Sequence, residues 1–194
     1  MSFHVKSKWV IGLTGPILSG KSTALSYFKQ CGAETISCDA VAATLYTRPA
    51  VLKKIKARLG TNDRAELAQL VFKNAVKRKA LEQILHPLIL KEVQAQVKAC
   101  AAPVVVIEAP LLFEAGWEKF TDLNIVLLAD PKTLQARLKG RAMSHSEYER
   151  RLKTQLLPLE KAARADIVWV HTGKAQLKQR VQRFCTVFKV LHKK

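Results

Sequence analysis

The strongest constraint in this sequence is the segment Gly15-Pro-Ile-Leu-Ser-Gly20-Lys21-Ser22, which fits the pattern G-x-x-x-x-G-K-[ST]. An apolar run from Lys8 to Leu13 precedes it and predicts a buried strand, and residues 22–30 carry apolar side chains at helical spacing. A glycine-rich loop between a strand and a helix can turn several backbone N–H groups toward one point. The segment therefore predicts a phosphate-binding loop rather than a glycine-rich turn that binds nothing.

Two side chains at the end of this loop have expected roles of their own. The amino group of Lys21 is expected to reach the β- and γ-phosphates of a nucleotide, and the hydroxyl of Ser22 is expected to ligate Mg²⁺. The N-terminus of the following helix adds partial positive charge. Such a loop indicates a bound nucleotide but does not specify the reaction.

The rest of the chain alternates between short apolar runs and segments with helical spacing. The apolar runs predict strands at 34–37, 103–107, 123–128 and 167–170. Helices are expected between these strands, and a last helix is expected at 174–191. Strands that alternate with helices predict a parallel sheet covered by helices, which is an α/β fold.

Local signals place several helix boundaries. Asp130 followed by Pro131 is typical of a helix start, and Ser144 with Glu147 predicts a capping box for a helix that runs to about residue 156. A further short helix is expected at 158–165.

The segment 39–98 is basic and helical in its pattern and contains no strand-like run. Pro49 and Pro87 are expected to break it into separate helices, because proline removes a backbone donor and clashes with the preceding turn. Asn62 and Asp63 predict a turn within it.

Charge and cysteine usage narrow the class of protein further. The chain has 33 Lys and Arg against 15 Asp and Glu, a formal charge of +18, which favours nucleic acid, anionic membranes or phosphorylated small molecules as partners. The longest nearly apolar run, residues 99–113, is too short and too interrupted by proline to span a bilayer.

The start of the chain does not fit a signal peptide, and the four cysteines show no C-x-x-C pair. We therefore expect a cytoplasmic protein with reduced thiols.

Two acidic residues follow predicted strands, at the edge of the sheet where ligands of open α/β folds bind. Asp39 comes just after the second strand and is expected either to accept a proton from an attacking hydroxyl or to help hold Mg²⁺, or else to cap the next helix. Its neighbour Cys38 is expected to face the packed side. Glu108 ends the third strand, where it is either a metal or water ligand or an exposed strand end.

Arginines cluster in the segment after the fourth predicted strand. Arg137 and Arg141 are four residues apart and are expected on one helix face, and Arg150 and Arg151 lie on the next helix. Arginines on a helical hairpin near a phosphate loop are typical of a mobile lid, although a solvated basic face has the same spacing.

These segments together resemble the dephospho-coenzyme A kinase family over nearly the whole chain. The resemblance rests on Ile11–Gly15 and Ser19–Thr23, on Ile36-Ser-Cys-Asp39, and on the distant segments Leu85-His-Pro-Leu-Ile89 and Pro110-Leu-Leu-Phe-Glu114. Arg137, Arg141, Arg151 and Gln155 resemble its lid, and Ala165-Asp166 with Gly173 resembles its last strand and loop.

The resemblance implies a reaction in which ATP phosphorylates the 3′-hydroxyl of the ribose of dephospho-CoA, giving CoA and ADP in the last step of CoA synthesis. It also implies a three-layer P-loop kinase fold with a five-stranded parallel sheet. The core is expected at about 8–47, 101–136 and 165–194, a helical acceptor-binding insertion at about 48–100, and a helical lid at about 137–164.

The resemblance also implies roles for individual residues. The expected ATP-binding residues are Gly15, Leu18, Ser19, Gly20, Lys21, Ser22, Thr23 and Arg137, with Ser22 also a ligand of Mg²⁺. Lys21, Asp39 and Arg141 are the expected catalytic residues, with Asp39 as general base and Arg141 as a lid contact to phosphate. Asp39, Arg64 and His86 are expected to bind the acceptor, although His86 also suits simple packing ahead of Pro87.

Four positions depart from the family's usual pattern. Pro16 and Leu18 stand where glycines are usual, which predicts a stiffer loop. Ser37 replaces the first of two aspartates and leaves Asp39 alone in that motif, and His171 stands where asparagine is common.

Two other functions remain open on the sequence. One is a small-molecule kinase of the same architecture that acts on a nucleotide or on a shikimate-like hydroxyl. The other is a basic, nucleic-acid-associated NTP-binding module, which predicts binding that weakens steeply with salt. The chain carries no recognised nucleic-acid motif and spreads its positive charge widely, so nucleic acid is the less favoured partner. The sequence does not predict an oligomeric state.

Overall fold

The computed structural model describes residues 8–141 and 143–191. These residues form two compact units, one made of the chain up to Ser37 together with the chain from Cys100 on, and the other made of Cys38–Ala99. Among the described residues, no helix is long and apolar enough to cross a membrane.

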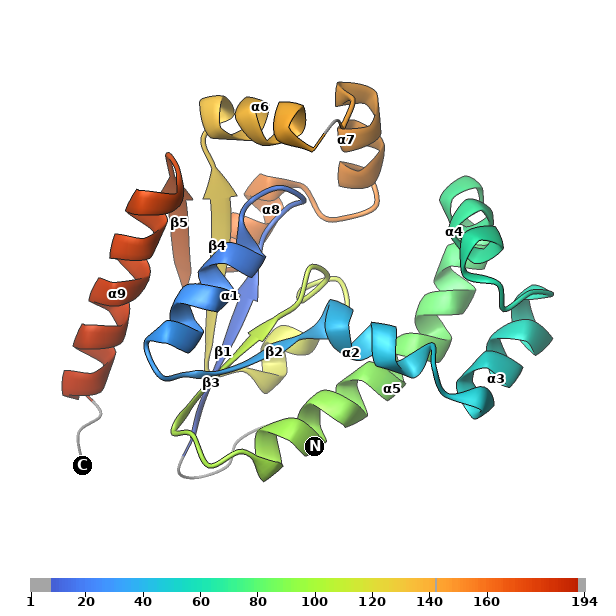
Figure 1. Cartoon of the computed structure of the whole chain (residues 1–194), viewed down its shortest axis with the longest axis horizontal. Coiled ribbons are helices and arrows are strands. Elements are labelled where there is room, and N and C mark those ends of the chain that lie inside the picture. Colours follow the sequence, from blue (N-terminus) through green and yellow to red (C-terminus); the bar gives the residue numbers. More distant parts are fainter. Residues whose placement is uncertain (1–7, 142, 192–194) are drawn as a thin grey trace. The chain divides into compact units, whose positions relative to one another are not determined.

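The first unit is built on a five-stranded sheet in which every pair of neighbouring strands is parallel (Figure 1). The strands are β1 (Trp9–Thr14), β2 (Glu34–Ser37), β3 (Val104–Glu108), β4 (Leu123–Ala129) and β5 (Ile167–His171), and their spatial order is β2-β3-β1-β4-β5. The central strand β1 is almost wholly buried, as its apolar run predicts. The predicted α/β class and the five-stranded parallel sheet are confirmed.

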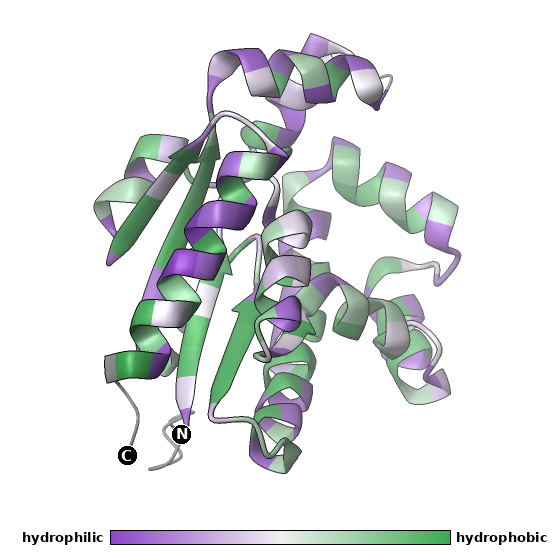
Figure 2. Ribbon diagram, turned by 60° about the vertical axis from the view of Figure 1, so that its left-hand side comes forward, coloured by the Kyte–Doolittle hydropathy of each residue, from purple (hydrophilic) through white to green (hydrophobic). Residues whose placement is uncertain are grey.

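The helices of the first unit are α1 (Lys21–Gln30), the 3₁₀ turn η1 (Trp117–Phe120), α6 (Pro131–Gly140), α7 (His145–Leu152), α8 (Pro158–Ala163) and α9 (Lys174–Leu191). Helices α1 and α9 pack against each other and place Phe28 and Leu177 on the buried side chains of the strands, such as Ile11 and Leu127. The strands are accordingly the most uniformly hydrophobic elements in Figure 2.

The helix boundaries follow the local signals closely. Asp130 caps α6 by accepting a hydrogen bond from the backbone N–H of Thr133 at 3.0 Å, and Pro131 is the first residue of that helix. Ser144 caps α7 through the N–H of Glu147 at 3.1 Å. The side chain of Glu147 pairs with Arg151 at 2.6 Å, and α7 ends at Leu152, about one turn earlier than expected.

The second unit contains α2 (Cys38–Leu45), α3 (Pro49–Leu59), α4 (Arg64–Lys73) and α5 (Ala75–Ala99). Helix α5 packs against the other three helices and buries one side chain on every fourth residue, namely Leu81, Leu85, Ile89, Val93 and Val97. Asp63 caps α4 by accepting from the N–H groups of Ala65 and Glu66. The functional division at 48 and 100 stays a prediction, since the compact unit itself begins at Cys38.

Pro87 does not break the helix, which corrects the prediction for this segment. Helix α5 is 25 residues long and runs unbroken through Pro87. An interior proline costs about 3 kcal/mol or more through the lost hydrogen bond and the clash with the preceding turn. The regular burial of apolar side chains along α5 offsets that cost, because each buried Leu or Ile contributes about 1.5–3 kcal/mol. Pro49 does mark a boundary, as the first residue of α3.

Candidate active site

The loop between β1 and α1 is shaped by glycines at its two ends. Gly15 has a φ of 147° and Gly20 a φ of 96°, both in the range that favours glycine. A Cβ on Gly15 would collide with the carbonyl oxygen of Leu127, so no other residue fits there without a shift of the chain. Gly20 is the N-cap of α1, which directs the first N–H groups of that helix into the loop. The loop thus has the backbone required of a phosphate cradle.

Lys21 is buried at the start of α1, with 8% of its surface exposed. Its amino group donates to the carbonyl oxygens of Gly15 at 2.9 Å and Pro16 at 3.0 Å. The lysine therefore folds back across the loop and places its positive charge inside it. Ser22 is exposed and Thr23 half-buried in the first turn of α1, on the side of the helix that opens to solvent.

Ser19 is the buried serine of the loop, with 1% exposed surface. Within residues 8–141 and 143–191, no hydrogen-bond partner is found for its hydroxyl oxygen. A buried hydroxyl without a partner costs about 1–3 kcal/mol, and such groups concentrate at functional sites.

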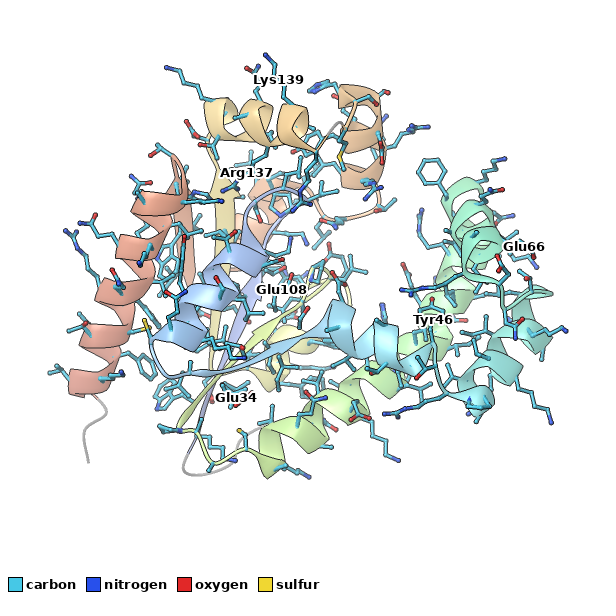
Figure 3. The ribbon with its side chains drawn as sticks, in the orientation of Figure 1. Glu34, Tyr46, Glu66, Glu108, Arg137 and Lys139 are labelled. Carbon is cyan, nitrogen blue, oxygen red and sulfur yellow. The ribbon has the colours of Figure 1, made fainter. Side chains whose placement is uncertain are left out.

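Arg137 reaches the phosphate loop from α6, as Figure 3 shows. Its guanidinium donates from Nη1 to the carbonyl oxygen of Leu18 at 2.8 Å. A Cβ on Gly20 would lie only 2.9 Å from the same Nη1, so the glycine makes room for the guanidinium. Burial lowers the pKa of Arg137, the nearby charge of Arg141 lowers it further, and Asp130 partly opposes both. The structure therefore brings the guanidinium of Arg137 to the phosphate loop.

Arg141 lies one residue beyond α6 as its C-cap, and its backbone φ of −107° is not helical. Helix α6 ends at Gly140, but the backbone N–H of Arg141 still donates to the carbonyl oxygen of Arg137 at 3.2 Å, so the expected one-turn spacing of the two arginines is kept. Arg141 is exposed and remains close enough to affect the charge balance at Arg137. On α7, Arg151 is engaged with Glu147.

The carboxyl ends of β2 and β3 carry a second polar pair. Ser37 lies opposite Glu108 in the strand register, and its hydroxyl donates to Glu108 Oε2 at 2.8 Å. Glu108 is buried with 3% exposed surface, so it is not an exposed strand end. An aspartate at position 37 would place a second carboxylate against Glu108, whereas the serine supplies a neutral donor. Ser37 therefore supplies a hydrogen bond to the buried carboxylate of Glu108, so the position has a structural role although it lacks the usual aspartate.

Asp39 is the second residue of the helical unit. Helix α2 begins at Cys38, so Asp39 lies inside the first turn, and its interpretation as a helix cap is wrong. The backbone of Asp39 is helical and its side chain is exposed. Cys38 is buried with 6% exposed surface, as expected, although it belongs to α2 and not to a strand. A carboxylate in the first turn of a helix is favoured by the helix dipole.

The two other acceptor candidates also belong to the helical unit. Arg64 begins α4 and lies over the ring of Tyr46, 5.3 Å from its centroid. Burial raises the pKa of Tyr46, and the charge of Arg64 partly opposes this. His86 is half-buried on α5, where burial lowers its pKa and Glu82 partly raises it. Sequence reasoning missed Tyr46 (labelled in Figure 3), which holds Arg64 in place.

Sequence reasoning treated His171 only as a departure, but the structure places it against the phosphate loop. His171 ends β5 and is fully buried. Its Nε2 lies 2.8 Å from the carbonyl oxygen of Ser19, and its Nδ1 lies 3.2 Å from the backbone N–H of Gly173. The tautomer with its proton on Nε2 satisfies both bonds, since it donates to Ser19 and accepts from Gly173. His171 thus connects the loop after β5 with the phosphate loop.

Lys161 is a second buried cation that the sequence did not reveal. It is fully buried on α8, where its amino group donates to the carbonyl oxygen of Pro110 at 2.6 Å and pairs with Glu114 at 2.9 Å. Glu114 also accepts from the N–H of Leu156 at 2.8 Å. Burial lowers the pKa of Lys161, and Glu114 opposes this shift. The network ties α8 and the chain before it to the segment that follows β3.

Oxygen donors around the loop fit the requirements of Mg²⁺. This ion keeps several waters and takes few protein ligands when substrate phosphates are present. The hydroxyl of Ser22 opens to solvent beside the loop, and Glu108 supplies a carboxylate at the carboxyl end of β3. No cluster of three or more His, Cys, Asp or Glu side chains that could hold a metal ion is found among the described residues.

Comparisons with known proteins point to one family. A family model described as dephospho-CoA kinase matches residues 9–177. A dephospho-CoA kinase of Symbiobacterium thermophilum is 37% identical over 177 residues, covering 84% of this chain and 74% of the relative. A crystal structure from Thermus thermophilus is 31% identical with a TM-score of 0.81, covering 93% of this chain and 97% of the other. The dephospho-CoA kinase structure from Campylobacter jejuni is 25% identical with a TM-score of 0.65, covering 93% and 96%. Because the family match covers well over half of the chain and agrees with the sheet and the loop, this chain belongs to the dephospho-CoA kinase family.

Proposed function

We propose that this protein transfers the γ-phosphoryl group of ATP to the 3′-hydroxyl of the ribose of dephospho-CoA, giving CoA and ADP. The family match across residues 9–177 is the observation that carries the proposal. The backbone of the phosphate loop and the position of Lys21 support it, because they are what such a transfer requires.

The phosphate loop is the proposed ATP site. On binding, the amino group of Lys21 exchanges its contacts with the carbonyl oxygens of Gly15 and Pro16 for contacts with phosphate oxygens. Phosphate oxygens carry negative charge whereas carbonyl oxygens do not, and this added attraction to the ammonium group favours the exchange. Ser22 is the proposed ligand of Mg²⁺, and the bound ion neutralises charge on the β- and γ-phosphates.

The helical unit is the proposed acceptor site. Asp39 orients the ribose hydroxyl and accepts its proton as the bond to phosphorus forms. Arg64 offers a cation to the anionic groups of the acceptor, and its contact with Tyr46 fixes its direction. His86 is the proposed third contact, where a lowered pKa favours the neutral ring as a hydrogen-bond partner.

The segment 137–164 is the proposed lid. Arg137 and Arg141 stabilise the negative charge on the transferred phosphoryl group, and Arg137 already lies against the loop. Closure of the lid excludes water, which would otherwise consume ATP by hydrolysis.

An assay of ADP release with purified protein and Mg-ATP tests this function. Dephospho-CoA, AMP, adenosine, shikimate and buffer without acceptor are compared at equal concentration. We expect rapid ADP release with dephospho-CoA alone. Release that is faster with AMP or shikimate would assign the chain to a different acceptor, and release that is independent of any acceptor would contradict a kinase function.

A further inference from the structure

Leu18 occupies an unusual position in the phosphate loop. Its φ is 65°, and among the described residues it is the only one other than glycine with a positive φ. A side chain in the left-handed region is strained and persists only where its surroundings hold it. We therefore ask which contacts hold Leu18 in this strained conformation.

The side chain of Leu18 is buried against the lid helices. It has 6% exposed surface and packs with Leu138 of α6 and Tyr148 of α7, which are 7% and 8% exposed. We call these three residues, with the partly buried Ile17, Leu134, Met143 and Leu152 around them, the loop–lid cluster. The cluster joins the phosphate loop to both helices of the lid hairpin.

The backbone of Leu18 makes a second contact with the same hairpin. Its carbonyl oxygen accepts a hydrogen bond from the guanidinium of Arg137, the residue that precedes Leu138 on α6. One residue of the loop thus holds α6 through both its side chain and its carbonyl group. A glycine at position 18 would keep only the carbonyl contact.

Helices α6 and α7 have little other support. Within residues 8–141 and 143–191, neither helix has an extensive contact with another helix or strand. Leu138 is the one buried residue of α6, and Tyr148 is the one buried residue of α7, and both lie in the loop–lid cluster. The burial that holds this hairpin in place is therefore centred on Leu18.

We propose that Leu18 is a positioning residue that anchors the lid hairpin to the phosphate loop and so sets where Arg137 and Arg141 stand relative to the transferred phosphoryl group. This inference rests on the proposed kinase function. Because the anchor is part of the loop itself, a change in the loop on nucleotide binding is passed directly to α6 and α7.

Three variants test this proposal. Leu18→Gly relieves the strained φ and removes the side chain, Leu18→Met keeps an apolar side chain of similar volume, and Leu138→Ala weakens the same contact from the lid. The readouts are hydrogen exchange of the α7 amides without ligands, and the ratio of phosphoryl transfer to acceptor-independent ATP hydrolysis. The thermal melting of each variant shows whether the rest of the protein remains folded.

We expect Leu18→Gly to speed exchange in α7 and to lower the transfer-to-hydrolysis ratio, each by about tenfold or more. Leu18→Met should restore both toward the parent values, and adding Leu138→Ala to Leu18→Gly should have little further effect, because both act on one contact. Parent-like α7 exchange in Leu18→Gly would overturn the proposal. If the parent protein fails to phosphorylate dephospho-CoA, the exchange data still decide whether Leu18 anchors the hairpin, so the two failures are distinguishable.

Discussion

Leu18 and Ser37 show how single substitutions in a motif can be compensated by their neighbours. The left-handed backbone at Leu18 costs about 1–2 kcal/mol, which is comparable to the 1.5–3 kcal/mol typical of burying a leucine side chain. Ser37 gives Glu108 a neutral donor in a buried place where a second acid would be repelled. Leu18 and Ser37 both depart from the usual pattern of the family, and in each case contacts with neighbouring residues compensate for the change.

Asp39→Asn tests the proposed general base. The amide keeps the size of the side chain but cannot take a proton, so turnover with dephospho-CoA should fall about 10²-fold or more while ATP affinity is retained. Steady-state kinetics and calorimetric ATP binding measure the two effects. Asp63→Asn is the matched control, because asparagine caps a helix as well as aspartate does. Turnover that is unchanged in Asp39→Asn would remove this residue from the role.

His171 allows a test of its two hydrogen bonds one at a time. In His171→Asn the amide can replace Nδ1 toward Gly173, but it is too short to reach the carbonyl oxygen of Ser19. In His171→Gln the longer side chain can reach Ser19. Losing one buried hydrogen bond costs about 1 kcal/mol, so we expect ATP to bind about fivefold more weakly to His171→Asn.

His171→Gln should bind ATP more tightly than His171→Asn does, and calorimetry on both variants measures this difference. Equal ATP affinity in the two variants would show that the contact between His171 and Ser19 does not position the phosphate loop.

At the scale of the elements, the strands and helix starts were predictable because their signals are local. Each buried strand is a short apolar run, and Asp130 and Ser144 cap their helices through bonds to residues three positions away. The continuity of α5 through Pro87 was not predictable, since it depends on packing against three other helices. Local preference was overridden there by the burial of a long apolar face.

Lys161 is the buried link between α8 and the segment after β3, and Lys161→Met tests its contribution. The methionine keeps most of the volume but leaves Glu114 and the carbonyl group of Pro110 without their donor. Removing one partner of a buried ion pair typically costs 3–5 kcal/mol, and because Glu114 reaches solvent we expect about 2–4 kcal/mol here. Denaturant unfolding at pH 7 measures this loss, with Lys139→Met on the exposed side of α6 as control.

The lowered pKa of Lys161 adds a pH dependence with a defined sign. Burial penalises the charged amine, so the folded protein loses this proton at a lower pH than the unfolded chain does. As the pH rises through the folded pKa toward 10.5, the parent protein is therefore stabilised relative to Lys161→Met, and the gap in unfolding free energy should widen. If the difference in unfolding free energy between the parent and Lys161→Met narrowed over this pH range, the pKa of Lys161 would not be lowered in the folded protein.

At the scale of the whole molecule, the sequence predicted the phosphate loop but not what surrounds it. The loop is predictable because its chemistry is confined to a few consecutive residues. The contacts from Arg137 and His171 span 119 and 152 residues of sequence, and they arise only because the parallel sheet brings the ends of β4 and β5 beside the end of β1. Long-range contacts of this kind depend on strand order, which no local pattern specifies.

The formal charge of +18 also acts at this scale. ATP and dephospho-CoA are polyanions, and a positive surface raises their local concentration near the protein. Nucleic acid stays the less favoured partner, and any binding of it that rests on charge alone would weaken steeply with added salt.

The central claim is that phosphate is transferred to one particular ribose hydroxyl, and acceptor analogues that lack single hydroxyls test it most directly. ADP release is measured with dephospho-CoA and with its 2′-deoxy and 3′-deoxy forms. The account predicts that the 2′-deoxy form is phosphorylated, and that the 3′-deoxy form competes for the site but accepts no phosphate. Acceptor-dependent ADP release with the 3′-deoxy form, accompanied by a phosphorylated product, would contradict it.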